Sequence, residues 1–248
     1  MISRERILRR ISIIWVFLLS SLSMALSPVP SESRQLLVVV SKDWQADHGQ
    51  LYRLERRGDS WRQVGKSIPV KLGKNGLGWG RGLHGFRQGS GPVKREGDGK
   101  APAGIFALSY LFGEGKETGF RYPYRRMSEF HRCVDDSRSR FYNRIVDSRR
   151  VPRDFRSSEK MKFASGLYRY GIAVAHNPRN IPGAGSCIFL HIQKPNGRPT
   201  VGCTAMKEGD LLSVMHWLDP EKHPLLIQAP RMVIGRLLPA NLQLTGLR

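Results

Sequence analysis

Short apolar segments alternate with turn-forming residues along the chain from residue 36 onward. The segments cover residues 36–40, 51–55, 64–72, 105–111, 171–175, 187–192 and 225–228. Each has the length and apolar character of a β-strand. Gly-rich stretches at 73–80 and 89–104 separate several of them, and Gly tolerates the backbone angles that tight turns need. The pattern predicts a mostly β fold rich in turns.

One segment has a helical period instead. Leu211, Val214, Met215 and Leu218 fall at positions i, i+3, i+4 and i+7, and Asp219-Pro220 ends the pattern. This spacing predicts one short helix after Met206. No repeat with a period of 20 to 50 residues is present.

The stretch 120–162 is rich in Arg and aromatic residues and has little periodicity. We expect it to be an insertion, which either runs over the surface as an excursion or lid or is poorly ordered. The remaining segments then form one domain over residues 34–248, with this insertion at about 120–162.

The first 27 residues have the composition of a secretory leader. Four Arg and one Glu precede an uncharged apolar run at 11–26, and Pro28 and Pro30 follow it. This run is shorter than the roughly 20 residues that cross a bilayer. It predicts a signal peptide over 1–27, with an N-terminal membrane anchor as the alternative. Both the signal peptide and the anchor predict an exported protein in the periplasm or cell-wall space.

Basic residues dominate the charge. The chain has 41 Lys and Arg against 20 Asp and Glu, a formal charge of +21, and removing residues 1–27 leaves +18. Nucleic-acid binding is not expected, because the basic residues are scattered and no recognition motif is present. The sequence contains neither a complete nucleotide-binding loop nor the residue spacing of a metal site. No nucleotide and no metal are therefore expected. Such a charge is compatible with two roles: binding to an anionic envelope surface, or a well-solvated surface without a specific partner.

His191 and Cys203 carry the candidate chemistry. They are 12 positions apart, and a hairpin-like return over the turn at 194–199 would bring their side chains together. An imidazole beside a thiol can take its proton. Cys203 also precedes the predicted helix, whose N-terminal dipole would favour a thiolate. Backbone N–H groups around Gly202 and Thr204 would then stabilise an oxyanion.

Residues 189–191, followed by Gly202-Cys203-Thr204-Ala205-Met206, resemble the catalytic signature of the L,D-transpeptidase (YkuD-type) family. Residues 97–106 resemble a glycine- and proline-containing segment upstream in the same family, and 183–186 and 217–220 extend the resemblance over most of 36–230. The resemblance implies a mostly β catalytic domain that acts on peptidoglycan stem peptides. It implies Cys203 as nucleophile, His191 as base, and no cofactor.

The chain departs from the family pattern at two positions and in the short interval between His191 and Cys203. Val201 stands where many members have a second His, and Ala205 stands where they have Arg. Arg198 or an Arg of the insertion is a candidate to replace the missing charge towards a substrate carboxylate. A backbone carbonyl or a polar side chain should orient His191, and Asn177 and Ser186 are the side-chain candidates.

The chain has three Cys, which allow three disulfide pairings. Pairing Cys133 with Cys187 would leave Cys203 as the free thiol and would attach the insertion beside the segment that holds His191.

These residues lead to one functional hypothesis and its alternatives. The hypothesis is a peptidoglycan L,D-transpeptidase of cell-wall biogenesis and cell shape, which releases D-Ala through a Cys203 thioester and transfers the acyl group to an amine. The first alternative is an L,D-carboxypeptidase or another cysteine peptidase of wall peptides. A non-catalytic basic protein that binds the cell envelope is an alternative of a different class.

Overall fold

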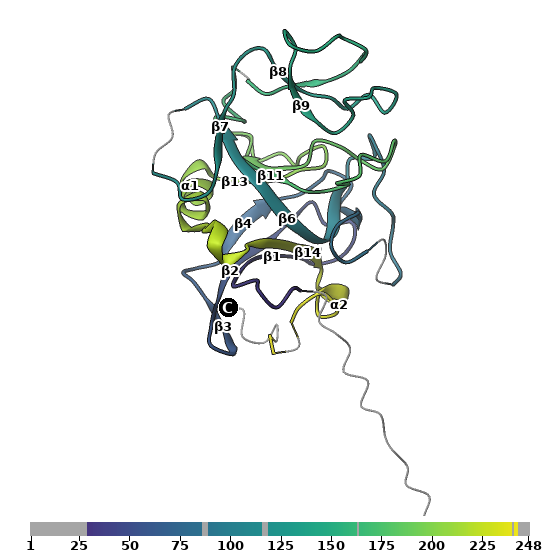
Figure 1. The fold of residues 1–248 in the computed structure, drawn as a ribbon. Helices are drawn as coiled ribbons and strands as arrows, with labels where there is room; N and C mark the ends of the chain where they lie inside the picture. Colours follow the sequence, from purple (N-terminus) through teal and green to yellow (C-terminus); the bar gives the residue numbers. More distant parts are fainter. Residues whose placement is uncertain (1–28, 86–88, 116–118, 163, 240, 243–248) are drawn as a thin grey trace, which may run out of the picture.

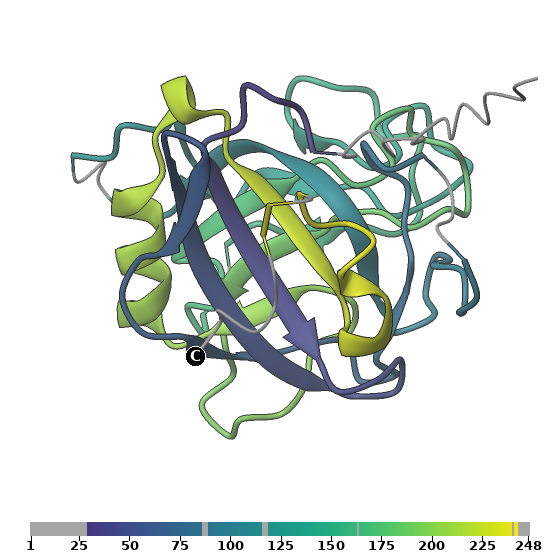
Figure 2. The same ribbon diagram turned by 90° about the horizontal axis from the view of Figure 1, so that it is seen from below.

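Eight strands close into a β-barrel. The computed structural model describes residues 29–85, 89–115, 119–162, 164–239 and 241–242. Around the barrel the order is β1 (Gln35–Ser41), β14 (Leu225–Pro230), β6 (Ala101–Gly113), β11 (Tyr170–Val174), β12 (Phe189–Ile192), β13 (Thr204–Met206), β4 (Ile68–Lys71) and β2 (His48–Arg57). Since β2 pairs again with β1, the ring closes (Figures 1 and 2). The mostly β fold predicted from the strand pattern is confirmed.

Two of the barrel contacts are parallel and the others are antiparallel. The parallel pairs are β1 with β14 and β12 with β13. Three shorter strands extend the sheet at its margins: β3 (Ser60–Gln63) on β2, and β5 (Leu77–Trp79) and β7 (Tyr124–Arg126) on β6.

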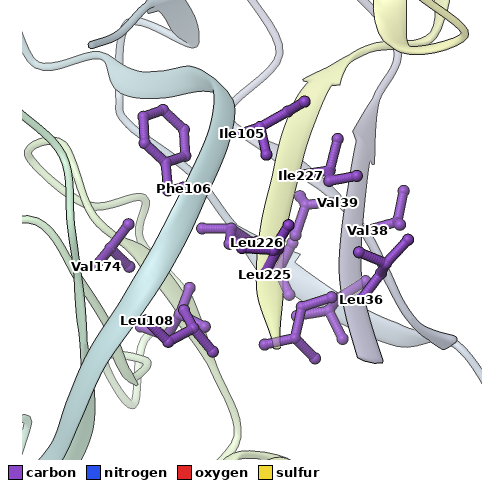
Figure 3. Packing of buried hydrophobic residues seen from close by; sticks show 14 of the residues in the cluster. Leu36, Val38, Val39, Ile105, Phe106, Leu108, Val174, Leu225, Leu226 and Ile227 are labelled. Atoms are coloured by element: carbon purple, nitrogen blue, oxygen red, sulfur yellow. The ribbon is translucent and has the colours of Figure 1, made fainter. Parts of the chain in front are cut away.

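The barrel interior and the outside of β1 and β14 are both covered, so these two strands are buried along their whole length. Leu36, Val38 and Val39 from β1 pack with Leu226 and Ile227 of β14 (Figure 3). The short helix α2 (Arg231–Ile234) contacts both strands. A strand covered on both faces requires a continuous apolar run, which explains why 36–40 reads as uninterrupted Leu and Val.

The predicted helix is present as α1 (Glu208–Trp217) and buries Leu211, Val214 and Met215. It contacts β11 and β12. A 3₁₀ turn follows at Pro220–Lys222, capped by Asp219, whose side chain accepts a hydrogen bond from the Glu221 N–H.

The Arg-rich insertion has a defined fold. After β7 it forms a second sheet of β8 (His131–Cys133), β9 (Ile145–Asp147) and β10 (Glu159–Lys160), in the order β10-β8-β9. This sheet lies beyond one end of the barrel (Figure 1). Its apolar side chains Met127, Cys133 and Met161 join a second core cluster with Tyr168, Phe189 and Cys203 of the barrel region. The insertion therefore packs against the part of the barrel that carries Cys203.

A disulfide joins Cys133 of β8 to Cys187, which precedes β12. Cys203 is a free thiol and is buried. Of the three pairings that the sequence allows, the structure contains the one that attaches the insertion to the strand of His191.

The expected hairpin between His191 and Cys203 is wrong. Because β12 and β13 pair in parallel, the loop between them must return along its own length before β13 begins. Thr200 holds this loop: its N–H donates to the Leu72 carbonyl and its carbonyl accepts from the Lys74 N–H. The return brings Cys203 beside β12 without a hairpin.

The proposed leader at residues 1–27 lies outside the described residues. Within the described part of the chain, no helix has the length and apolar character needed to span a membrane.

Loss of the cross-link should destabilise the protein. The disulfide spans 54 residues, and closing a loop of this length restricts the unfolded chain by about 4 kcal/mol in the chain-entropy model. The double variant Cys133→Ala/Cys187→Ala should therefore lose about that much free energy of unfolding, measured by urea denaturation. Cys203→Ala, which keeps the cross-link, is the control. A loss in the double variant no larger than in this control would contradict the expectation.

Candidate active site

His191 on β12 and Cys203, just before β13, line one cavity. His191 is in β12, opposite Ala205 of β13, and Cys203 directly precedes β13. The cavity has a volume of about 190 Å³ and is also lined by Glu159, Tyr168 and Arg198. The structure thus brings together the two residues that the sequence singled out.

The Cys203 thiol is held by backbone groups. The Phe189 N–H donates to its sulfur over 3.3 Å, and the thiol donates to the Cys187 carbonyl over 3.4 Å. Burial, followed by the charge of Glu159, raises the pKa of the thiol to about 12. In this state Cys203 is a protonated thiol.

The helix does not favour a Cys203 thiolate, which corrects the sequence expectation. β13 lies between Cys203 and α1, and α1 begins only at Glu208. The helix dipole acts over about one turn, so it does not reach the sulfur. Another group must accept the thiol proton if Cys203 reacts as a nucleophile.

His191 is buried and neutral. Its Nδ1 lies 2.8 Å from the Ile192 carbonyl, which can only accept, so Nδ1 carries the proton and donates. Nε2 is then unprotonated. Burial lowers the pKa of the imidazole to about 4. A neutral imidazole with a free Nε2 lone pair can accept a proton at neutral pH.

The orienting group of His191 is this carbonyl, so the side-chain candidates are wrong. Asn177, with a φ of 50°, donates to the carbonyls of Ile181 and Gly185 and accepts from the Ile181 N–H, which holds its own loop together. Ser186 donates to Glu96 over 2.7 Å. Neither has a hydrogen bond with His191.

Of the oxyanion donors expected around Gly202 and Thr204, the Gly202 N–H is engaged elsewhere. The Gly202 N–H donates to Thr200 Oγ1 over 3.1 Å, so it does not point to an oxyanion position in this state. Thr204 is buried, and its hydroxyl donates to Gln228 Oε1 over 2.7 Å on β14. Gly202 has a φ of 152°, which L side chains rarely adopt, so its role here is conformational. Arg198 lines the cavity.

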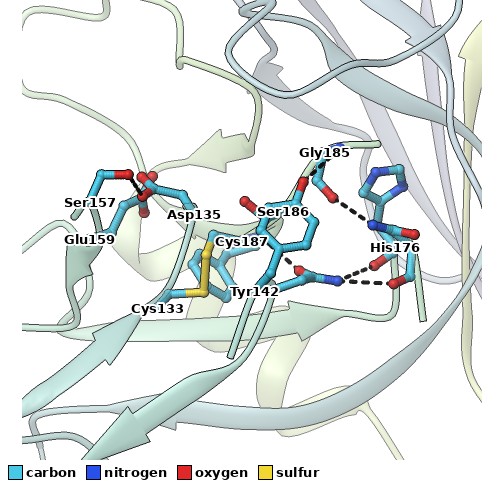
Figure 4. The surroundings of a disulfide bond; sticks show 12 residues. Cys133, Asp135, Tyr142, Ser157, Glu159, His176, Gly185, Ser186 and Cys187 are labelled. Atoms are coloured by element: carbon cyan, nitrogen blue, oxygen red, sulfur yellow. Dashed lines mark hydrogen bonds between the residues drawn. A yellow bond between two sulfur atoms is a disulfide. The ribbon is translucent and has the colours of Figure 1, made fainter. Parts of the chain in front are cut away.

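Figure 4 shows the disulfide beside a polar cluster. Tyr142 and Ser186 both donate to the Glu96 carboxylate, and Ser157 donates to Asp135 over 2.5 Å. A second cavity of about 200 Å³ is lined by these carboxylates, by Lys74 and Lys94, and by Cys203. Cys203 and Glu159 therefore stand between two cavities, the first mainly apolar and the second charged.

Tyr168 and Glu159 are site residues that the sequence did not indicate. The Tyr168 hydroxyl donates to Glu159 Oε2 over 2.8 Å, and both residues line the cavity of Cys203. Its ring packs edge-on against His191, with 5.3 Å between ring centroids. Burial raises the pKa of Glu159 to about 7. Glu159 comes from the insertion, where no motif marks it.

No cluster of three or more His, Cys, Asp or Glu that could hold a metal ion is found among the residues that the structure describes.

Comparisons with known proteins give little beyond this geometry. No family model and no curated protein matches the chain. The solved structure of Bd1075 from Bdellovibrio bacteriovorus aligns with 81% of this chain and 49% of its own, at 15% sequence identity and a TM-score of 0.40. The chain thus spans about half the length of that protein. A likeness at this level carries no inference about activity.

The raised pKa of Glu159 predicts how its replacement changes stability with pH. The folded protein keeps this proton up to about pH 7, whereas the ordinary carboxyl value is 4.5. The contribution of Glu159 to the free energy of unfolding therefore falls as pH rises from 4.5 to about 7, because the folded state keeps this proton over that range. Glu159→Gln does not titrate, so it should gain stability relative to the wild type over this range.

Urea denaturation of both proteins at pH 4, 6 and 8 measures this difference. It should grow with pH and level off above about 7. Glu129→Gln, which removes an exposed carboxylate of the insertion, is the matched control. A difference for Glu159→Gln that is the same at all three pH values would contradict the expectation.

Proposed function

We propose that this protein is a cysteine acyltransferase of peptidoglycan stem peptides, with L,D-transpeptidase activity. The observation that carries the proposal is the shared cavity of Cys203, which is the single free thiol, and His191, a neutral imidazole. The resemblance of residues 189–191 and 202–206 to the L,D-transpeptidase signature supports the same reaction.

The reaction follows the chemistry of an activated thiol. As the Cys203 sulfur attacks the carbonyl carbon between the third and fourth stem residues, the S–H bond breaks and His191 Nε2 accepts the proton. The C–N bond to D-Ala then breaks, and His191 gives the same proton to the leaving amine. The acyl group remains on Cys203 as a thioester until an amine of a second stem, or water, attacks it. Amine attack forms a cross-link, whereas water gives an L,D-carboxypeptidase. The proposed chemistry uses no cofactor.

The cavity suits a peptide that carries a carboxylate. Leu167, Pro199 and Val201 supply apolar walls, while Lys194 and Arg198 supply positive charge. Arg198 is the group that we assign to the substrate carboxylate, in place of the Arg that the family has where Ala205 stands. Guanidinium groups bind carboxylates in a fixed two-pronged geometry, which favours this choice over Lys194.

The proposed location is the periplasm or wall space. The Cys133–Cys187 disulfide supports an oxidising compartment, since structural disulfides persist mainly outside the cytosol. The leader-like composition of residues 1–27 agrees with export. A formal charge of +18 for the remaining chain would attract the protein to the anionic polymers of the envelope.

Purified disaccharide-tetrapeptide tests the proposal. Wild-type protein should release D-Ala, with a cross-linked dimer or a tripeptide as the second product, identified by mass spectrometry. Cys203→Ala and His191→Ala should each lower turnover by at least about a thousandfold, as expected for the nucleophile and its base.

His48→Ala is the matched control, because the His48 side chain is largely exposed and lies outside the cavity. It should retain wild-type turnover. Full activity of Cys203→Ala would remove the thiol from the mechanism. Absence of any product with wild-type protein would instead favour a basic envelope-binding protein, whose binding to wall material falls with added salt.

A further inference from the structure

A buried lysine lies next to the segment that carries the free thiol. The side chain of Lys94 is only 4% exposed, and it lines the second cavity together with Gly202 and Cys203. Its Nζ lies 3.8 Å from the point that a Cβ atom at Gly202 would occupy. Its stem packs along Gly185, where a Cβ atom would lie 3.2 Å from Cε. A positive charge is therefore buried beside the nucleophile of the proposed reaction.

Hydrogen bonds hold this ammonium in place. Lys94 Nζ donates to the Arg95 carbonyl and to Asp98 Oδ1, each over 2.6 Å. Asp98 is itself fixed, because its carboxylate also accepts the N–H groups of Arg95 and Lys100. Asp98 belongs to the segment 97–106, to which the sequence assigned no chemistry. An ammonium has three N–H donors, so one remains for a group that enters the cavity.

The proposed reaction needs such a charge. Attack by sulfur places a negative charge on the carbonyl oxygen, which a donor must stabilise. The Gly202 N–H is engaged with Thr200 Oγ1. Burial and then the charge of Glu159 raise the pKa of the Cys203 thiol to about 12, whereas the charge of Lys94 acts to lower it. Lys94 therefore favours the charged states that burial and Glu159 oppose.

The other cations of the site are less suited to this role. Lys74 also lines the second cavity, but it is exposed, so water and salt screen its charge. Lys194 and Arg198 line the first cavity, where Arg198 is assigned to the substrate carboxylate. A charge acts more strongly in a buried setting than in water, which favours Lys94.

We propose that the Lys94 ammonium stabilises the negative charge of the reaction at Cys203, first on the thiolate sulfur and then on the oxyanion of the attacked carbonyl. The assignment deepens the proposed function and rests on Cys203 as its nucleophile. Lys94 is a catalytic residue in this scheme, because its remaining N–H contacts the reacting atoms. Asp98 holds the ammonium in position.

Lys94 gives and takes no proton in this scheme. The S–H proton of Cys203 goes to His191 Nε2, the sulfur forms a bond to the carbonyl carbon, and the π electrons of the carbonyl move to its oxygen. The Lys94 N–H donates a hydrogen bond to that oxygen. When the C=O bond forms again and the C–N bond to D-Ala breaks, His191 gives its proton to the leaving amine. Lys94 is then in its starting state.

Alkylation of the Cys203 thiol by iodoacetamide tests the role of the charge without any substrate. Lys94→Met keeps the length of the buried side chain and removes its ammonium. An opposite charge close to an ionisable group shifts its pKa by about one unit or more, so alkylation at pH 8 should be slower by about tenfold or more. Intact mass follows the reaction, and circular dichroism identifies the folded variants, which alone are compared.

Turnover of disaccharide-tetrapeptide tests the role at the oxyanion. Lys94→Met should lose on the order of a hundredfold in kcat with little change in KM, as expected when a donor to the oxyanion is removed. A general disturbance of the site would raise KM as well, so this split separates the two causes.

Two further variants complete the test. Lys94→Met/Asp98→Asn removes both charges of the pair, so no unpaired carboxylate stays buried. Asp98 does not line the cavity, so this double variant should change in the same direction as Lys94→Met. Lys100→Met is the matched control: it removes a lysine charge from the same segment, but this Nζ bonds the Asn75 carbonyl and Lys100 lines neither cavity. It should react like the wild type.

Alkylation at the wild-type rate in the folded Lys94 variants, an unchanged kcat of Lys94→Met, or an equal loss in Lys100→Met would each overturn the assignment of Lys94. These results would leave the proposed function standing. Conversely, slower alkylation of the Lys94 variants alone, in a protein that does not turn over the tetrapeptide, would support the role of the charge and refute the proposed substrate.

Discussion

The parallel pairing of β12 with β13 is the contact on which the site depends. It closes the barrel between β11 and β4, and it sets the register that places His191 opposite Ala205, with Cys203 one position before the strand. A slip of one residue would turn every side chain of β13 to the other face, so Cys203 would leave the cavity and Thr204 would lose Gln228. The strand pairing that closes the barrel therefore also sets the positions of His191 and Cys203.

Burial has two opposite effects at this site. It keeps His191 neutral, which suits a proton acceptor, but it also keeps Cys203 protonated, which opposes nucleophilic attack. The insertion adds a further ionisable group, because Glu159 lines the same cavities as Cys203, and the disulfide attaches the insertion to the segment before β12. An Arg-rich segment that resembles a surface addition thus provides part of the candidate site.

The sequence predicted local elements well and long-range geometry poorly. Apolar runs such as 36–40 and the helical period at 211–218 are local signals, and both elements are present. The parallel return to Cys203 depends on Thr200 pairing with 72–74, a contact between distant residues that no local pattern contains. Asn177 and Ser186 were misassigned for the same reason, since spacing does not reveal that they bond within other loops. No sequence pattern indicated Glu159 or Tyr168, because the two residues come together only when the insertion folds onto the barrel.

The central claim is that Cys203 carries the acyl group of a stem peptide. Intact-mass spectrometry of the full chain, quenched in acid soon after mixing with disaccharide-tetrapeptide, tests it most directly. The account predicts a mass increase equal to the disaccharide-tripeptide acyl group, located on the peptide that contains Cys203 and removed by hydroxylamine, as expected for a thioester. Product formation without this adduct in the quenched samples, or an adduct on any other residue, would contradict it.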